Sequence, residues 1–232
     1  MSLFYVPTLS TAHILPEEES QHAIKVLRLQ VGAIITIVDG VGGFYTAKII
    51  NPHPKHSAFE ITETIAEYGK RDYKLHIAIA PTKNIERLEW FIEKATEIGI
   101  DEITPILCRF SERKIIKADR LEKIIVSAAK QSVKAYFPKL NPLCTFDELM
   151  KKHLTGQKFI AHCYEEDKKL LKSEIQKSSD MMILIGPEGD FSKEEVQKAI
   201  SAGFIPVSLG NSRLRTETAG VVASCTVAVI NC

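Results

Sequence analysis

Two charged residues near the C-terminus, Arg215 and Glu217, have the chemistry to assist a reaction beside a bound ligand. A guanidinium group stabilises developing negative charge, and a carboxylate can accept a proton. Both follow a bend at Gly210, where the backbone can approach a ligand closely because glycine has no Cβ. Glu217 also fits a plain acidic residue in the first turn of a helix, where a carboxylate favours the N-terminal dipole. Both roles of Glu217 therefore stay open at this point.

A second glycine-containing bend lies upstream, at Gly186-Pro187-Glu188-Gly189. It follows the continuous apolar run 181–185, which is typical of a strand buried on both faces of a parallel sheet. Ser192 and Glu195 then form a capping-box pattern that predicts a helix start. The apolar segment 204–209 is the next expected strand. Because ligands bind outside the carboxyl ends of strands in open α/β sheets, we expect both bends at one ligand-binding edge.

The chain from Tyr73 onward alternates apolar strands with amphipathic helices, which predicts an α/β fold with a mostly parallel sheet and helices on both faces. Further strands are expected over 75–80, 103–107 and 159–163, and helices over 84–98, 121–133 and 168–177. Residues 1–68 differ, because short strands at close spacing predict a small β-barrel. A helix is expected there over 16–29, with His22, Val26 and Leu29 on its apolar stripe. The expected domains are therefore residues 1–68 and 73–232.

The composition is that of an ordinary globular chain and does not identify a partner. The 232 residues carry a formal net charge of +1, so RNA binding would depend on a local cationic patch. The 5 cysteines are scattered and form no C-x-x-C pair, which favours reduced thiols and a cytoplasmic location. No apolar run reaches the roughly 18 residues that a membrane span needs. We expect no membrane partner.

Two other patterns suggest binding sites only superficially. Gly40-x-Gly42 follows a strand, but the next residues predict another strand and not a helix, so a hairpin is expected rather than a dinucleotide loop. His53 and His56 lie in a proline-rich loop without further ligands. Because zinc usually needs three or four protein ligands, we expect no metal site.

The two glycine bends and the residues after them resemble a known family. The motifs are Gly186-Pro187-Glu188-Gly189 and Leu209-Gly210-x-x-x-Leu214-Arg215-Thr216-Glu217-Thr218-Ala219. They resemble the cofactor loops of the SPOUT class of RNA methyltransferases, and within it the small-subunit (16S) ribosomal RNA uridine-N3 methyltransferases. Residues 22–32 also resemble the N-terminal signature of that family, in a fold like the PUA RNA-binding barrel.

The resemblance implies a C-terminal SPOUT-type, trefoil-knotted domain that binds S-adenosylmethionine, a ribosomal RNA substrate and a homodimer. The implied cofactor-binding residues are Leu184, Ile185, Gly186, Pro187, Glu188, Gly189, Leu209, Gly210, Leu214 and Thr216. The implied catalytic candidates are Arg215, Glu217 and Arg113, the last of which could reach the site across a dimer. The implied RNA-binding residues are His22, Lys25 and Arg28, which lie at helical spacing and could share one face.

Three residues depart from the family pattern. Lys130 stands where a glutamate would be usual, which reverses a charge, and Lys134 stands where an arginine would be usual. The second change keeps the charge but loses a bidentate fork. Asp190 replaces a third glycine that often follows Gly189, and we expect it only to narrow the geometry of the turn.

Two alternatives to uridine-N3 methylation stay open. The same fold could methylate another RNA, for example the ribose 2′-oxygen of transfer RNA, although the N-terminal barrel argues against this. The chain could also be an RNA-binding module that has lost catalysis. The intact motifs around Gly186 and Arg215 argue against such a loss.

Overall fold

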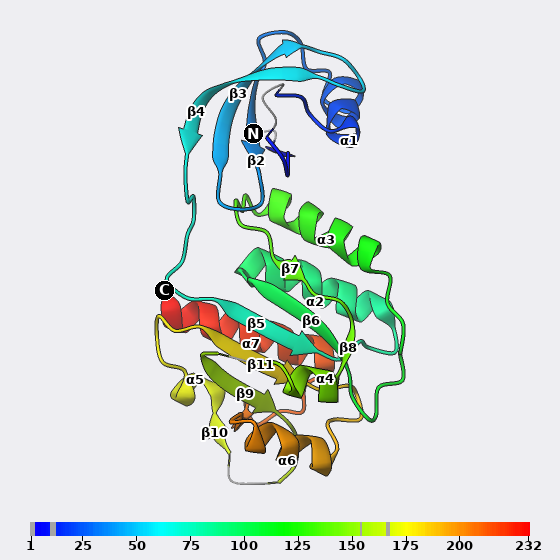
Figure 1. The fold of residues 1–232 in the computed structure, drawn as a ribbon, viewed down its shortest axis with the longest axis vertical. Coiled ribbons are helices and arrows are strands. Elements are labelled where there is room, and N and C mark those ends of the chain that lie inside the picture. The colour runs from blue at the N-terminus through cyan, green and yellow to red at the C-terminus, as the bar shows by residue number, and fades with distance from the viewer. Residues whose placement is uncertain (1–2, 10–12, 154, 166–167) are drawn as a thin grey trace. The chain divides into compact units, whose positions relative to one another are not determined.

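The computed structural model describes residues 3–9, 13–153, 155–165 and 168–232, and Figure 1 labels its elements. The chain divides into two compact units. The first combines Met1–Lys70 with Val126–Phe137, and the second combines Arg71–Ile125 with Pro138–Cys232. A segment from the middle of the sequence therefore completes the N-terminal unit.

The first unit is built on a four-stranded sheet in the order β1-β2-β3-β4. Its strands are β1 (Leu3–Tyr5), β2 (Ile34–Val38), β3 (Phe44–Asn51) and β4 (Ala58–Ile65). β1 runs parallel to β2, whereas the other neighbours pair antiparallel. The side chains that are at most 1% exposed in its core include Ile35, Ile37, Ala47, Ile49 and Phe59. The predicted small β-domain is confirmed.

The helix of this unit changes type part-way. Helix α1 covers Glu17–Gln21, and a π-helix, η1, continues it over His22–Val26. The Leu27 N–H donates to the His22 carbonyl five residues earlier, at 3.0 Å. The wider turn places Ala23 in the core and leaves Val26 65% exposed. The helix expected over 16–29 is therefore confirmed only over 17–26 and partly as a π-helix, and the placement of His22 and Val26 on its apolar stripe was wrong.

Lys130 forms an ion pair inside the first unit. It lies in helix α3 (Ala118–Gln131), whose residues from Val126 onward belong to that unit. Its Nζ atom lies 2.6 and 2.8 Å from the two carboxylate oxygens of Glu19, and 5.9 Å from the centroid of the Phe4 ring. The Glu19 side chain is only 12% exposed. The charge that departs from the family pattern thus neutralises a mostly buried carboxylate.

We expect Lys130→Glu to destabilise the protein, because two carboxylates would then face each other with little water between them. The free energy of unfolding should fall by roughly 2 kcal/mol, less than for a fully buried pair since Lys130 keeps some solvent contact. Adding Glu19→Lys in the same chain should restore most of this loss, as measured by urea unfolding.

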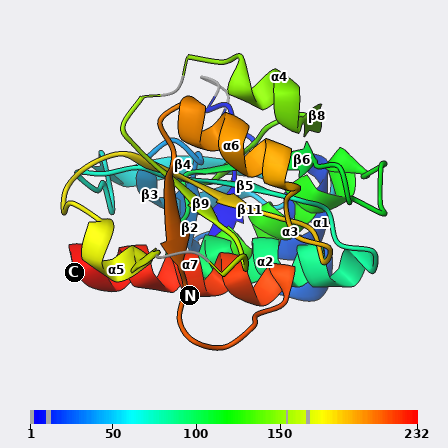
Figure 2. The ribbon, with the colours of Figure 1, turned by 90° about the horizontal axis from the view of Figure 1, so that it is seen from below.

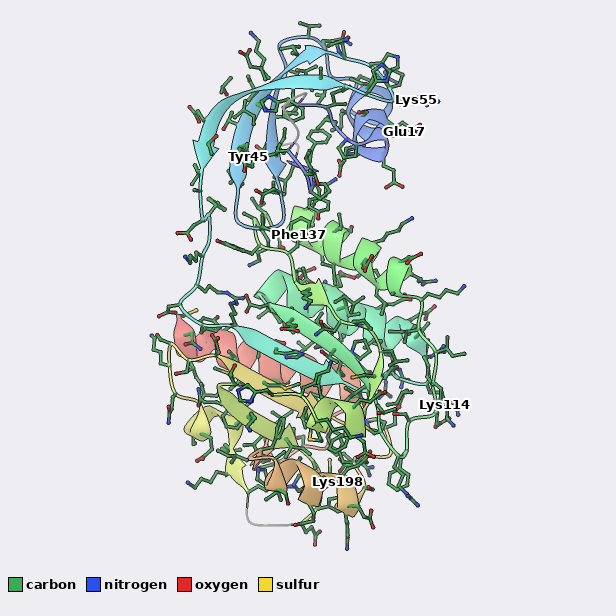
Figure 3. The ribbon with its side chains drawn as sticks, in the orientation of Figure 1. Glu17, Tyr45, Lys55, Lys114, Phe137 and Lys198 are labelled. Carbon is green, nitrogen blue, oxygen red and sulfur yellow. The ribbon has the colours of Figure 1, made fainter. Side chains whose placement is uncertain are left out.

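The control is the exposed pair Lys55–Glu17, whose atoms lie 4.0 Å apart with side chains 68% and 57% exposed (Figure 3). Lys55→Glu should leave the unfolding midpoint unchanged, because exposed ion pairs contribute little. A double exchange at 19 and 130 that is no more stable than Lys130→Glu alone would contradict the proposed pairing.

The second unit contains a parallel sheet in the order β10-β12-β9-β11-β5-β6-β7, with β8 also paired to β6. Its strands are β5 (Leu75–Ile79), β6 (Glu102–Leu107), β7 (Lys139–Leu140), β8 (Cys144–Thr145), β9 (Gln157–Ala161), β10 (Lys169–Leu170), β11 (Met181–Ile185) and β12 (Ile205–Ser208). β11 lies in the middle and all five of its side chains are buried, as its continuous apolar run predicted.

Helices cover both faces of this sheet (Figure 2). On one face lie α2 (Ile85–Ile98) and α7 (Thr216–Asn231), and on the other lie α4 (Phe146–Met150) and α6 (Lys193–Ser201). The predicted α/β architecture is confirmed, and the knotted crossing of the last helix stays a prediction. Within the described part of the chain, no helix combines the length and apolar character that crossing a bilayer requires.

The helix expected over 168–177 was wrong in part. Lys169 and Leu170 form strand β10, parallel to β12, and only the short helix α5 (Leu171–Glu174) follows. Leu171 is buried at its start. Pairing with a strand that lies far along the chain overrides the local helical propensity of this segment.

Candidate active site

Two adjoining cavities, of about 350 and 260 Å³, open at the carboxyl ends of β9, β11 and β12. Ala161, Cys163, Arg213, Leu214 and Ala219 line both. The larger is further lined by His162, Lys168, Val207, Ser208, Leu209, Gly210, Asn211 and Ser212. The smaller is further lined by Ile185, Gly186, Pro187, Glu188, Asp190, Arg215 and Thr216. The two glycine bends therefore border one continuous region of the sheet edge.

Strand β9 lies between the two strands that carry the bends. Its carboxyl end contributes Ala161 and Cys163 to both cavities. Sequence reasoning predicted this strand but did not place it at the site, because strand order in a sheet is not written in local patterns. The signal that could have identified it is that β9 was itself expected as a buried strand of the same parallel sheet, whose carboxyl end lies at the ligand-binding edge.

The start of α7 is tied directly to the upstream bend. The buried Thr216 hydroxyl donates to the Gly186 carbonyl at 3.0 Å. A Cβ on Gly186 would lie 3.1 Å from the Phe191 ring, so a side chain here would crowd that fully buried ring. Gly210 has φ +135°, a conformation that glycine adopts without strain. Close packing therefore favours glycine at position 186, and backbone conformation favours it at position 210.

Asp190 does more than narrow a turn. Its backbone is left-handed, with φ +66°. One carboxylate oxygen accepts the Cys163 N–H at 2.7 Å, and the other accepts the Phe191 N–H at 2.8 Å. The side chain thereby connects the end of β9 to the loop after β11. Burial, and then the Asp190 charge, raise the pKa of the Cys163 thiol, which keeps that thiol neutral beside the cavity.

Asp190→Ala is expected to lower the free energy of unfolding by roughly 3 kcal/mol, from left-handed strain on alanine and loss of two charge-assisted hydrogen bonds. Asp190→Gly should cost about 1 kcal/mol less, because glycine accepts the same backbone without strain. Guanidinium unfolding of the three proteins measures both differences. Equal stability of the alanine and glycine variants would rule out the contribution of backbone strain. An Asp190→Gly protein as stable as the wild type would rule out the contribution of the two hydrogen bonds.

Four of the predicted catalytic and cofactor-binding residues line neither cavity: Leu184, Gly189, Glu217 and Arg113. Leu184 is fully buried in the core beneath α4 and α6. The Cα of Gly189 packs against Phe110, where an added Cβ would lie 2.9 Å from the Phe110 Cβ. Glu217 is only 7% exposed and lies 3.8 Å from Arg87 Nε, and its Oε2 atom has no hydrogen-bond partner among the described residues.

Arg113 holds a neighbouring loop. Its guanidinium donates to the Thr82 carbonyl at 3.0 Å and to the Lys83 carbonyl at 2.7 Å. The Lys83 N–H in turn donates to Glu188, whose carboxylate oxygen lies 2.9 Å away. Arg113 and Glu188 therefore fix the segment after β5 between the loops that follow β6 and β11. The sequence predicted neither the contact of Arg87 with Glu217 nor the cluster of Arg113, Lys83 and Glu188.

The predicted RNA-binding residues lie on the surface of the first unit. His22, Lys25 and Arg28 are all exposed. Arg28 has φ +55°. Lys25 belongs to the π-helix and Arg28 follows it, so they do not share the regular α-helical spacing assumed from the sequence.

Comparison with known proteins identifies the family. A family model described as RNA methyltransferase domain matches residues 70–228, and one described as RNA methyltransferase PUA domain matches residues 15–62. A ribosomal RNA small subunit methyltransferase E from Buchnera aphidicola is 31% identical over 222 residues, covering 93% of this chain and 87% of the relative. This chain belongs to that methyltransferase E family. A Bacillus subtilis member is 27% identical over 89% of this chain and 85% of its own length.

Solved structures of similar proteins share the entire fold. A probable rRNA-methyltransferase from Porphyromonas gingivalis superimposes with a TM-score of 0.93 and 40% identity, over 100% of this chain and 98% of that one. A methyltransferase E from Neisseria gonorrhoeae, bound to S-adenosyl methionine, gives 0.86 and 27% over the same shares. Both units of this chain therefore have counterparts in members of the family.

Proposed function

We propose that this protein transfers a methyl group from S-adenosylmethionine to the N3 position of a uridine in small-subunit (16S) ribosomal RNA. The observation that carries the proposal is the cavity pair at the sheet edge, bordered by both glycine bends and by Arg215, in a chain of the methyltransferase E family. The ribosomal RNA substrate follows from the family, and the N3 position is the finer part of the proposal.

The cavities fit S-adenosylmethionine. Val207, Leu209 and Leu214 offer apolar walls for a flat adenine ring, and the close backbone at Gly210 suits its polar edge. The smaller cavity adds Gly186 and Thr216. We propose that Ile185, Pro187 and Glu188 complete the binding site, with Leu184 and Gly189 supporting it from outside the cavities.

When bound, the cofactor supplies an electrophilic methyl group on a sulfonium. The chain's own task is then to hold the uracil ring and to stabilise the charge that develops as its N3 proton leaves. Arg215 is exposed and lines the smaller cavity, so we assign it to the uracil oxygens or to an adjacent phosphate.

Glu217 is assigned as proton acceptor with Arg87 as its partner. The Arg87 Nε atom lies 3.8 Å from Oε1 of this carboxylate, and the Oε2 atom has acceptor capacity that no described residue uses. Arg113 is the remaining catalytic candidate. We propose that the protein acts as a homodimer, in which Arg113 reaches the site of the other subunit. We further propose that the protein acts in the cytoplasm.

The first unit supplies reach beyond a single base. We propose that His22, Lys25 and Arg28 contact phosphates of flanking RNA, because all three side chains are exposed and two carry positive charge. The net charge of the chain is only +1, so such contacts must be local.

Mass spectrometry of RNA nucleosides from a strain lacking the gene tests the proposal. Loss of one N3-methyluridine from 16S ribosomal RNA, restored by the wild-type gene, is the expected result. Loss of a ribose 2′-O-methyl group from transfer RNA would establish the alternative substrate. Unchanged modification, together with no S-adenosylmethionine binding in calorimetry, would establish a non-catalytic RNA-binding module.

A further inference from the structure

An exposed aromatic side chain, Phe110, lies on the loop between β6 and α3. It is 46% exposed, and Ile115 on the same loop is 77% exposed. Exposing a phenylalanine to water forfeits the favourable free energy of burying its ring. Neither residue belongs to the described core of the second unit, so core packing does not account for the exposed part of the Phe110 ring.

The loop presents Phe110 from a fixed backbone. The Cys108 N–H donates to the Ser111 hydroxyl at 3.0 Å, and the Ser111 N–H donates to the Cys108 carbonyl at 3.0 Å, which closes a tight backbone turn that contains Phe110. The next donor, the Arg109 N–H, binds Oε1 of Glu195 at 2.8 Å. Glu195 is only 8% exposed and its other oxygen caps helix α6. The backbone that carries Phe110 is therefore held in place by hydrogen bonds on both sides of it.

The turn abuts the cofactor loop. The Cβ of Phe110 packs so closely on Gly189 that a Cβ there would lie 2.9 Å away. The neighbours of Gly189 on both sides, Glu188 and Asp190, line the smaller cavity. The aromatic ring is thus attached to the wall of the cavity that also holds Arg215.

The same loop also carries exposed cationic side chains. Arg109, Lys114 and Lys117 are exposed, and Lys114 extends outward in Figure 3. The acidic Glu112 is neutralised by Lys83, whose Nζ atom lies 2.8 Å away. Exposed aromatic rings among basic residues are the pattern that binds single-stranded nucleic acid, through stacking on the ring and contacts to phosphates.

We propose that Phe110 is the platform on which the target uracil stacks when it leaves its place in the RNA. This inference rests on the proposed function and adds a positioning residue to it. An extruded base loses its stacking partners, and an aromatic ring on a fixed backbone beside the cavity replaces one of them. The basic residues of the loop hold the phosphates on either side.

The first test reads stacking directly by fluorescence. The chain has a single tryptophan, Trp90, so Phe110→Trp in a Trp90→Phe background places the sole indole at the platform. The probes are an RNA fragment spanning the mapped methylation site and the same fragment with an abasic target position. The uridine fragment should quench the indole and the abasic fragment should not. Equal quenching by both, or quenching by neither, would overturn the proposal.

The second test separates this inference from the proposed function. Phe110→Ala should weaken binding of the uridine fragment by about 10-fold, while the affinity for S-adenosylmethionine stays unchanged. Phe110→Tyr should retain binding, and Ile115→Ala serves as the exposed control on the same loop. If wild-type protein methylates the fragment and Phe110→Ala binds it equally well, the platform is wrong and the function stands. If wild-type protein neither binds the cofactor nor methylates the fragment, the proposed function itself fails.

Discussion

Replacing Arg215 by alanine should lower kcat by about 100- to 1,000-fold, the range found when a single stabilising donor is removed from an active site. The guanidinium is exposed beside the smaller cavity. Within the described residues it has no ion pair, and it makes no side-chain hydrogen bond at the cap of α7. Its charge is therefore available to a substrate anion rather than committed to the fold.

Single-turnover methylation of ribosomal RNA measures the effect, with S-adenosylmethionine affinity and the urea midpoint as controls. Both controls should match the wild type, because the side chain supports neither the core nor an ion pair. Arg215→Lys should recover part of the rate, since it restores the charge without the planar fork. Near-normal turnover by Arg215→Ala would remove this residue from the mechanism.

Replacing Gly220 by leucine should give the largest loss of stability. Gly220 lies in α7 and faces α2, where an added Cβ would lie 2.5 Å from the Phe91 ring and 3.1 Å from Ile79. Both of those side chains are fully buried, so neither can move aside. The two helices would have to separate, at a cost of roughly 3 kcal/mol or more in the free energy of unfolding.

The matched control is Cys225→Leu, which adds leucine to an exposed position of the same helix. It should leave the unfolding midpoint nearly unchanged, because no buried neighbour meets the new side chain. Circular dichroism during urea titration measures both variants. A Gly220→Leu protein as stable as Cys225→Leu would show that α2 and α7 can part at little cost.

Local patterns in the sequence were sufficient for several elements of the second unit. The Ser192–Glu195 capping box is present, with both reciprocal hydrogen bonds, at the start of α6. The apolar run 181–185 is a fully buried central strand, and the expected helix over 84–98 agrees with α2 to within one residue. Each of these elements depends on residues that are close together in the sequence, so local patterns are enough to predict it.

The failures share a different cause. The π-helix at His22–Val26 places Ala23 in a core formed by distant strands, and the strand at Lys169–Leu170 pairs with β12, so both involve contacts that local propensity does not contain. The pair Glu19–Lys130 joins residues 111 positions apart. The positive charge of Lys130, which departs from the family pattern, therefore has its partner, Glu19, in a distant part of the sequence.

By itself, the sequence determined the two glycine bends, the strands that precede them and the family to which they point. Only the tertiary structure decided that β9 lies between those strands, that Asp190 bridges Cys163 to the next loop, and that Phe110 packs on Gly189. The physical reason is that bends and strands follow from short-range sterics and periodicity. The composition of a site instead follows from strand order and from hydrogen bonds such as Arg109–Glu195, which spans 86 residues and leaves no periodic trace in the chain.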